Sequence, residues 1–105
     1  MQALRDVLQQ TQKRGVAIGH FNISDLVLLN AVVAAARELD VPVIVGASQG
    51  ERDFMGVHEI AALVKSLRED SGVPIFLNAD HTHSLAKAEE AARAGFDTIR
   101  KPTTA

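Results

Sequence analysis

Four consecutive polar residues, Asp80-His81-Thr82-His83, follow a short apolar run and carry the side chains best suited to chemistry. A carboxylate such as Asp80 can accept or donate a proton, and imidazoles such as His81 and His83 can bind a metal ion. The spacing fits a simpler interpretation equally well, in which Asp80 ends a strand and both histidines lie in solvent. Because one loop cannot complete a metal shell, the rest of the chain must decide between the two.

The sequence around this cluster predicts a strand before it and a helix after it. The apolar segment Ile75–Ala79 follows Pro74 and has the length of a buried strand. Ser84 is a suitable N-cap for a helix over Leu85–Ala94, and Gly95 is a natural stop for that helix. The cluster is therefore expected at the carboxyl end of a strand, where parallel α/β folds place their functional residues.

The remaining segments predict the same alternation of strands and helices. Helices are expected over residues 2–14, from a cap at Ser24 or Asp25 to Leu39, and over 56–69, and strands over 16–21, 43–45 and 96–99. The small residues 46–50 predict a loop that a ligand can approach closely, and a polar loop is expected to follow it. Regular alternation with short loops predicts parallel strands and right-handed crossovers in one domain.

Two architectures fit this alternation, namely part of a (β/α)8 barrel and a small open sheet of the flavodoxin type. Asn22, Ser48 and the Asp80-His81 pair follow the first, second and third predicted strands, so in a barrel they would converge on one mouth. An open sheet often has a glycine-rich phosphate loop after its first strand, and residues 20–23 do not form one. The strand-end residues therefore favour a partial barrel, since a complete barrel needs about 250 residues.

Composition and charge exclude several classes of function. The 105 residues include 11 basic and 13 acidic side chains, a net charge of −2, four Phe and no Trp or Tyr. A basic stripe and stacking aromatics are both missing, so no nucleic-acid partner is expected. Without cysteine there are no disulfides or thiolate metal sites. No segment has the pattern of a signal peptide or a membrane span, so no membrane partner is expected and the cytoplasm is the expected location.

Four motifs occur in order along the chain: Gly19-His20-Phe21-Asn22, Pro42-Val43-Ile44-Val45-Gly46-Ala47-Ser48-Gln49-Gly50, Asp80-His81 and Ala92-Arg93-Ala94-Gly95-Phe96. Each motif is weak by itself, but their combination is specific. Together they resemble the opening of the class II, zinc-dependent ketose-bisphosphate aldolases, which include the fructose-bisphosphate and tagatose-bisphosphate aldolases. The resemblance covers about residues 2–99.

This resemblance implies a (β/α)8 barrel that reversibly splits a ketose 1,6-bisphosphate into dihydroxyacetone phosphate and an aldehyde. A zinc ion, Zn2+, would polarise the ketone oxygen. Matched by motif, His81 would be the first zinc ligand, and Asp80 the acid/base that moves a proton at the aldehyde-derived hydroxyl. Ser48 would bind the substrate near a phosphate, and Asn22 would also contact the substrate.

Three departures from the family pattern qualify these expectations. Thr82 and His83 follow the Asp-His pair where the family usually has Gly, and His83 is expected to be exposed rather than an accessory ligand. The charged residues and Pro102 in the segment 100–105 fit poorly into a buried strand. The family's other two histidine ligands and its glycine-rich phosphate loops are missing, and one ligand cannot hold a catalytic zinc.

Residues 1–105 are therefore expected to be the N-terminal fragment of a single barrel domain, inactive by itself. Two alternatives stay open: a non-catalytic half-barrel for assembly or sugar-phosphate binding, and a different enzyme on an open sheet. Open strand edges also predict a homo-oligomer. Of the other histidines, His20 is expected to pack or hydrogen-bond and His58 to lie in solvent.

Overall fold

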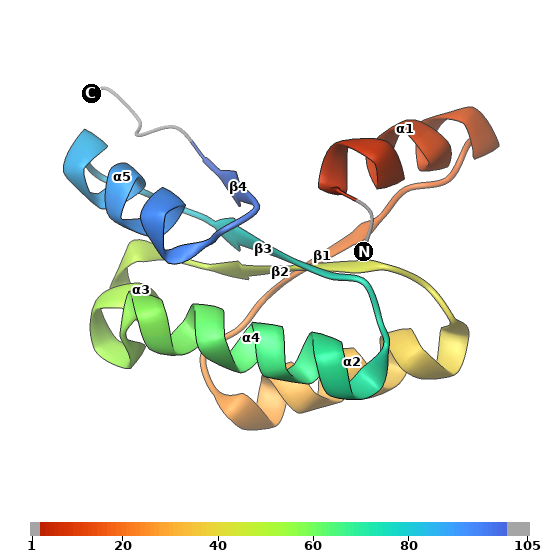
Figure 1. Ribbon diagram of the computed structural model, residues 1–105, viewed down its shortest axis with the longest axis horizontal. Helices are drawn as coiled ribbons and strands as arrows, with labels where there is room; N and C mark the ends of the chain where they lie inside the picture. The colour runs from red at the N-terminus through yellow and green to blue at the C-terminus, as the bar shows by residue number, and fades with distance from the viewer. Residues whose placement is uncertain (1–2, 101–105) are drawn as a thin grey trace.

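The computed structural model describes residues 3–100, which form a parallel sheet with helices around it (Figure 1). The helices are α1 (Leu4–Arg14), α2 (Leu26–Leu39), α3 (Gln49–Met55), α4 (Val57–Ser71) and α5 (Leu85–Ala94). The strands are β1 (Gly19–Asn22), β2 (Val43–Ala47), β3 (Ile75–Ala79) and β4 (Thr98–Ile99). At least one helix separates each strand from the next, as the alternation predicted.

The strands lie side by side in the order in which they occur in the chain, β1-β2-β3-β4, and each pair is parallel. A flavodoxin-type sheet would instead have the order 2-1-3. A (β/α)8 barrel adds its strands one after another, as this sheet does. The fold is therefore that of a partial (β/α)8 barrel, with a leading helix and about three and a half βα units, as predicted.

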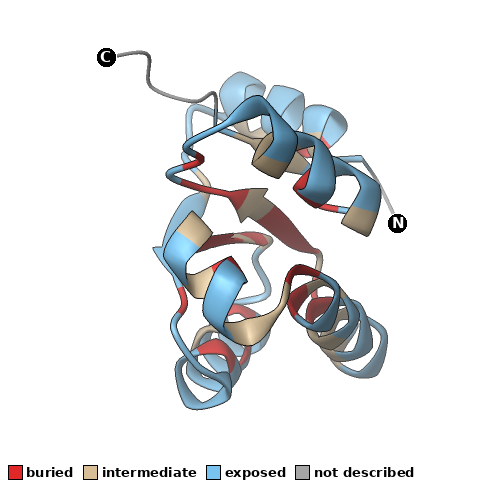
Figure 2. Cartoon of the chain, turned by 90° about the vertical axis from the view of Figure 1, so that its left-hand side faces the viewer, coloured by how far each residue is buried: buried red, intermediate tan, exposed pale blue. Residues whose placement is uncertain are grey.

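One face of the sheet packs against α2 and α4 and forms the apolar core. Alternate residues of a strand point to opposite faces, and those of β2 and β3 that enter this core are Val43, Val45, Ala47, Ile75, Leu77 and Ala79. Figure 2 shows the buried residues on the strands and on the helix sides that face them. This face corresponds to the outside of a barrel, which helices cover.

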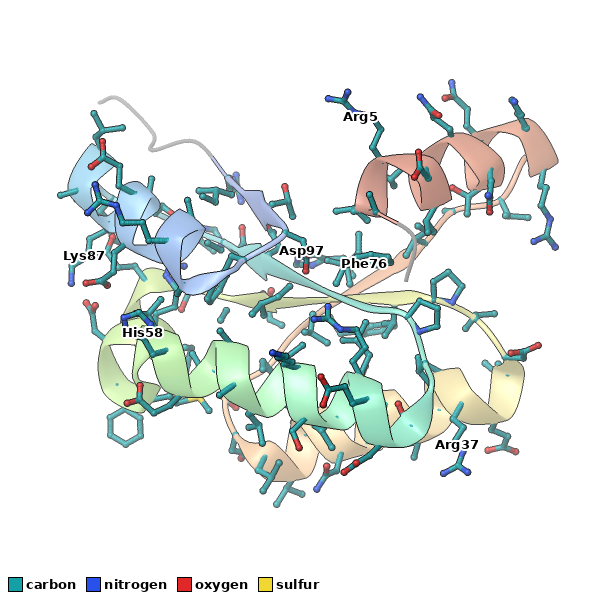
Figure 3. The ribbon with its side chains drawn as sticks, viewed as in Figure 1. Arg5, Arg37, His58, Phe76, Lys87 and Asp97 are labelled. Carbon is teal, nitrogen blue, oxygen red and sulfur yellow. The ribbon has the colours of Figure 1, made fainter. Side chains whose placement is uncertain are left out.

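The opposite face, here called the inner face, corresponds to the interior of a barrel. The strand register aligns its residues in two levels, first His20, Ile44 and Phe76, then Asn22, Gly46 and Asn78. Helix α1 lies on this side of the sheet, away from α2 and α4 (Figure 1). Phe76 is fully buried and lies on the α1 side in Figure 3. The first level is thus apolar at Ile44 and Phe76 and polar at His20, and the second level, nearer the carboxyl ends of the strands, carries the two amides of Asn22 and Asn78.

Capping residues, some of them predicted from the sequence, mark the ends of the helices. The side chains of Asp25, Ser48 and Ser84 cap α2, α3 and α5, and each accepts the backbone N–H of the third residue after it. Gly95 ends α5 in the left-handed conformation, with φ 103°, as expected of a glycine stop. None of the helices within residues 3–100 combines the length and the hydropathy that a membrane span requires.

The first strand begins later than predicted. β1 starts at Gly19 rather than at residue 16, because β2 starts at Val43 and Val43 pairs with Gly19. Residues 16–18 therefore have no strand partner at that end of the sheet. Asn22, which was predicted to follow the strand directly, is its last residue.

The segment after β2 also differs from the prediction. Gly46 and Ala47 continue β2 instead of opening a loop, and Ser48 directly caps α3, which was predicted as a polar loop. The last strand, β4, is shorter than the predicted 96–99, and the Asp97 carboxylate accepts the Leu77 N–H at 2.8 Å beside it. Figure 3 shows Asp97 at this junction. The predicted break in the segment 101–105 lies outside the described residues.

Candidate functional site

The turn after β3 holds Asp80 and His81 at the carboxyl edge of the sheet. Asp80 is 7% exposed, whereas the His81 side chain is 56% exposed. The Asp80 N–H donates to the Ala47 carbonyl at 3.0 Å and so joins the ends of β2 and β3. His81 has a left-handed backbone, with φ 42°, which is uncommon for a residue other than glycine. Its Nε2 lies 3.5 Å from Asp80 Oδ2, so the predicted acid/base and metal ligand are neighbours.

Asp80 is held in its ionised form. Burial acts to raise its pKa, but the hydrogen bond from the His81 backbone and the Arg100 guanidinium outweigh burial and lower the pKa below the usual value for Asp. Arg100 Nη1 lies 3.4 Å from Asp80 Oδ1, and the Arg100 N–H donates to the Ala79 carbonyl. At neutral pH Asp80 is therefore a proton acceptor.

Asn22 and Ser48, the predicted substrate contacts, line one small cavity at the carboxyl ends of β1 and β2. The cavity measures about 210 Å³, and its other lining residues are Ile23, Ser24 and Glu51. Ser48 Oγ accepts the Glu51 N–H at 3.3 Å, which leaves its own O–H free to donate to a ligand. The four predicted site residues are thus arranged as two pairs, because the described wall of this cavity does not include Asp80 or His81.

The inner face below this edge carries a polar bridge across β2. Asn78 Nδ2 donates to His20 Nε2 at 3.0 Å, so side chains of β3 and β1 meet above the strand between them. Gly46 of β2 makes this possible, because a Cβ at that position would lie 2.5 Å from the His20 ring and 2.8 Å from Asn22 Oδ1. The hydrogen-bonding role expected of His20 is confirmed.

Helix α3 contacts the turn through residues that were not predicted to matter. Arg52 is 3% exposed, and its guanidinium donates to the carbonyls of Ala47 and Asp80 and to the Thr82 hydroxyl. Gln49 Oε1 accepts the His83 N–H at 2.8 Å. No sequence signal marks Arg52, since two of its acceptors lie 28 and 30 positions away along the chain.

The described residues do not contain a complete metal site. Within residues 3–100, no group of three or more His, Cys, Asp or Glu side chains is placed to hold a metal ion. His83 is exposed, as expected, and so is His58. His81 offers an accessible imidazole, but a catalytic zinc needs about three protein ligands, so the remaining ones would have to come from other residues.

Comparison with known proteins identifies the family. The profile described as fructose-bisphosphate aldolase class II matches residues 2–100, nearly the whole chain. The chain belongs to the class II fructose-bisphosphate aldolase family. The family resemblance predicted from the four motifs is therefore confirmed, as is its extent along the chain.

Individual relatives show how much of such a protein this chain represents. It is 32% identical over 100 residues to a fructose-bisphosphate aldolase of Staphylococcus aureus, and 35% identical over 100 residues to one of Geobacillus stearothermophilus. Each alignment covers 92% of this chain and 35% of the relative. The chain thus spans about a third of the length of these curated relatives and matches the family's N-terminal part.

Solved aldolase structures have the same fold over the matching part. The YdjI aldolase from Escherichia coli K12 superposes with a TM-score of 0.83 at 23% identity, covering 93% of this chain and 38% of that one. The fructose-bisphosphate aldolase of Campylobacter jejuni gives 0.73 at 26% identity, covering 87% and 29%. The first of these, below 25% identity, supports the fold alone.

Proposed function

We propose that this chain provides the Asp80–His81 part of a zinc-dependent aldolase site that reversibly cleaves a ketose 1,6-bisphosphate into dihydroxyacetone phosphate and an aldehyde. The observation that carries the proposal is the contact between Asp80 and His81 at the carboxyl edge of the sheet, 3.5 Å apart. The cavity of Asn22 and Ser48 opens at the same edge, on the neighbouring strands. Parallel barrels place their active sites at this edge.

Each residue has a role that its surroundings allow. Asp80 is a carboxylate at neutral pH, so it accepts the proton of the aldehyde-derived hydroxyl during cleavage and returns it during condensation. The exposed imidazole of His81 is a metal ligand. The free O–H of Ser48 donates to a phosphate oxygen, and the Asn22 amide hydrogen-bonds the substrate.

Zinc binding by the whole enzyme would need residues beyond this chain. His81 is one suitable ligand, and the described residues do not complete the set, so we derive no catalytic step through the metal. We propose that residues 1–105 are the N-terminal part of a single barrel domain whose other segments supply the missing ligands. The 35% share of the relatives' length supports this proposal.

The decisive experiment is a fusion in which residues 1–100 replace the matching N-terminal segment of the Geobacillus stearothermophilus aldolase. Cleavage of fructose 1,6-bisphosphate is measured with a coupled dehydrogenase that reduces the product. We expect chelator-sensitive cleavage. Asp80→Ala should lower kcat by about 10²- to 10⁴-fold while zinc stays bound. His81→Ala should lose both zinc and turnover. Wild-type rates in both variants would refute the assigned roles.

The 105-residue chain by itself should show no measurable cleavage in the same assay, because the described residues cannot complete a zinc shell. The assay is run once with added zinc and once after zinc has been removed with a chelator. Robust zinc-dependent cleavage by the purified chain would contradict the proposal that further segments are required.

We also propose that the isolated chain associates with copies of itself. The outer edge of β1 has no partner strand among the described residues, and an apolar groove runs between β1 and α2. Unpaired edges and apolar grooves of this kind promote association. A half-barrel that assembles without catalysing a reaction is the second candidate function, and inactivity of the fusion together with stable self-association would favour it.

A further inference from the structure

Arg52 is a charged side chain buried beside the candidate site. Its Nη1 donates to the Ala47 carbonyl at 2.6 Å and to the Asp80 carbonyl at 2.8 Å, and its Nη2 donates to Thr82 Oγ1 at 3.1 Å. Only 3% of the residue is exposed. Burying a guanidinium is costly unless its donors are satisfied, and here they meet backbone and hydroxyl oxygens rather than a carboxylate.

Two of the three acceptors belong to the residues on either side of His81 in the chain, and the third ends the neighbouring strand. Asp80 precedes His81, Thr82 follows it, and the carbonyl of Ala47 ends the neighbouring strand. Between two of these anchored residues, His81 has its left-handed backbone, with φ 42°. Non-glycine residues in this region are held there by surrounding contacts, and such residues concentrate at functional sites.

We propose that Arg52 is the positioning residue of the Asp80–His81 turn. It holds the Asp80 carbonyl before His81 and the Thr82 hydroxyl after it, and so sets where the carboxylate and the imidazole point. Gln49 of the same helix assists, since its N–H donates to the His81 carbonyl at 3.3 Å and its side chain accepts the His83 N–H. The functional meaning of this positioning rests on the aldolase function proposed above, whereas the positioning itself can be measured without it.

The chain contains a matched control for a purely structural arginine. Arg68 Nη1 donates to the Ile75 carbonyl at 3.1 Å, at the opposite end of β3. Arg68→Met therefore removes an arginine-to-carbonyl bond from the same strand without touching the turn. A general loss of stability should appear in both variants, whereas a change in the turn should appear only in Arg52→Met.

The test is NMR of the labelled 105-residue chain, in wild type and with Arg52→Met or Arg68→Met. Two readouts report the turn: the backbone chemical shifts of His81, which reflect its left-handed conformation, and hydrogen exchange at the amides of Gln49 and His83. In Arg52→Met we expect the His81 shifts to move toward ordinary values and both amides to exchange at least about tenfold faster. In Arg68→Met both should stay near wild type. Arg52→Lys, which keeps the charge but not the fork of donors, should restore the turn only in part.

Unchanged His81 shifts and exchange in Arg52→Met would overturn the proposal, and so would an equal disturbance in Arg68→Met. If Arg52→Met does not fold, Thr82→Val removes one acceptor and leaves Arg52 in place. It should move the same signals in the same direction by less, and no movement would count against the proposal. In an active fusion, Arg52→Met should lower kcat about 10- to 100-fold with little change in KM. An inactive wild-type fusion would refute the aldolase function but not the positioning role of Arg52, because the NMR experiment does not depend on catalytic activity.

Discussion

At the scale of single residues, the chemistry of the site depends on what surrounds one carboxylate. Asp80 is nearly buried, yet Arg100 and the His81 backbone keep its pKa low. The structure thus adds a charged partner, Arg100, that the motif did not predict. Arg100 directly follows β4, and Asp80 directly follows β3, which pairs with β4. The pairing of these two strands therefore places Arg100 beside Asp80.

The low pKa of Asp80 predicts a stability that depends on pH. A group whose folded-state pKa is depressed stabilises the fold above its unfolded pKa, about 3.9 for Asp, and this contribution is lost as pH falls through the folded pKa. We expect the urea concentration at the midpoint of unfolding to decrease as the pH is lowered below about 4. In Arg100→Met this decrease should be less steep. Arg93→Met, an exposed arginine on α5, is the control and should follow wild type. Identical pH profiles for Arg100→Met and wild type would exclude the pairing.

A second residue-scale prediction concerns Gly46. In Gly46→Ala the new methyl group would meet the His20 ring and the Asn22 side chain, so the His20–Asn78 bridge should open. Loss of the hydrogen bond should lower the free energy of unfolding by about 0.5–1.5 kcal/mol. Replacing glycine by alanine makes the unfolded chain less flexible, which should raise the free energy of unfolding by about 0.4–1 kcal/mol. The urea midpoint should therefore change little, while the ring nitrogen shifts of His20 move in NMR. Retained His20 shifts would show that the bridge does not need glycine.

At the scale of elements, α3 is the part of the fold with the most consequence for the site. It is capped by Ser48, which lines the cavity shared with Asn22, and its buried Arg52 reaches the turn after β3. Ser48 caps the helix with its oxygen, and the proposed function gives its O–H a second task, binding a phosphate. These tasks can be separated by substitution.

Ser48→Asp should keep the cap and lose the phosphate contact. Asp caps helices as well as Ser does, so the stability of the chain should change by less than about 1 kcal/mol. A carboxylate in the cavity would repel a phosphate, and in the fusion KM for fructose 1,6-bisphosphate should rise by about tenfold or more. Ser84→Asp makes the same change at the cap of α5 and should leave KM unaltered. An unchanged KM in Ser48→Asp would remove Ser48 from the substrate site.

Elements with clear boundaries in the sequence were predicted well, and those that depend on distant contacts were not. β3 was predicted at its observed bounds because Pro74 and Asp80 delimit its apolar run. α3 has no apolar repeat to reveal it, and it is anchored by Arg52 bonds to residues far along the chain. The positions of Asp80 and His81 followed from motif and strand end, whereas Arg52 and Arg100 required the folded structure.

At the scale of the whole molecule, the sheet formed by residues 3–100 has no further strand beside β1 or beside β4. Phe21 is 49% exposed beside the apolar groove at β1, and Leu39 at the end of α2 is 71% exposed. In a complete barrel, strands and helices would cover both sides. This exposed apolar surface is the physical basis for expecting the chain to self-associate.

Sedimentation should show association that grows with concentration from about 10 μM to 1 mM. Phe21→Lys puts a charge at the β1 edge and should shift the chain toward monomer. Phe54→Lys is the matched control, because Phe54 is 88% exposed on α3, outside the groove. A monomer at all concentrations would argue against assembly, and equal effects of the two lysines would argue against the β1 edge.

The order of the strands has a consequence for how the polypeptide is made. Each strand pairs with the one synthesised before it, so no strand has to insert between two that are already paired. A ribosome adds about 5–20 residues per second, which is slow compared with the formation of local structure. The pairing of β1 with β2 needs nothing beyond Gly46 in sequence, and β3 can join once α4 has emerged. The sheet can therefore grow on the nascent chain from its first strand, one βα unit at a time. The Asp80 turn then forms only after β1 and β2, whose carboxyl ends line the cavity of Asn22 and Ser48.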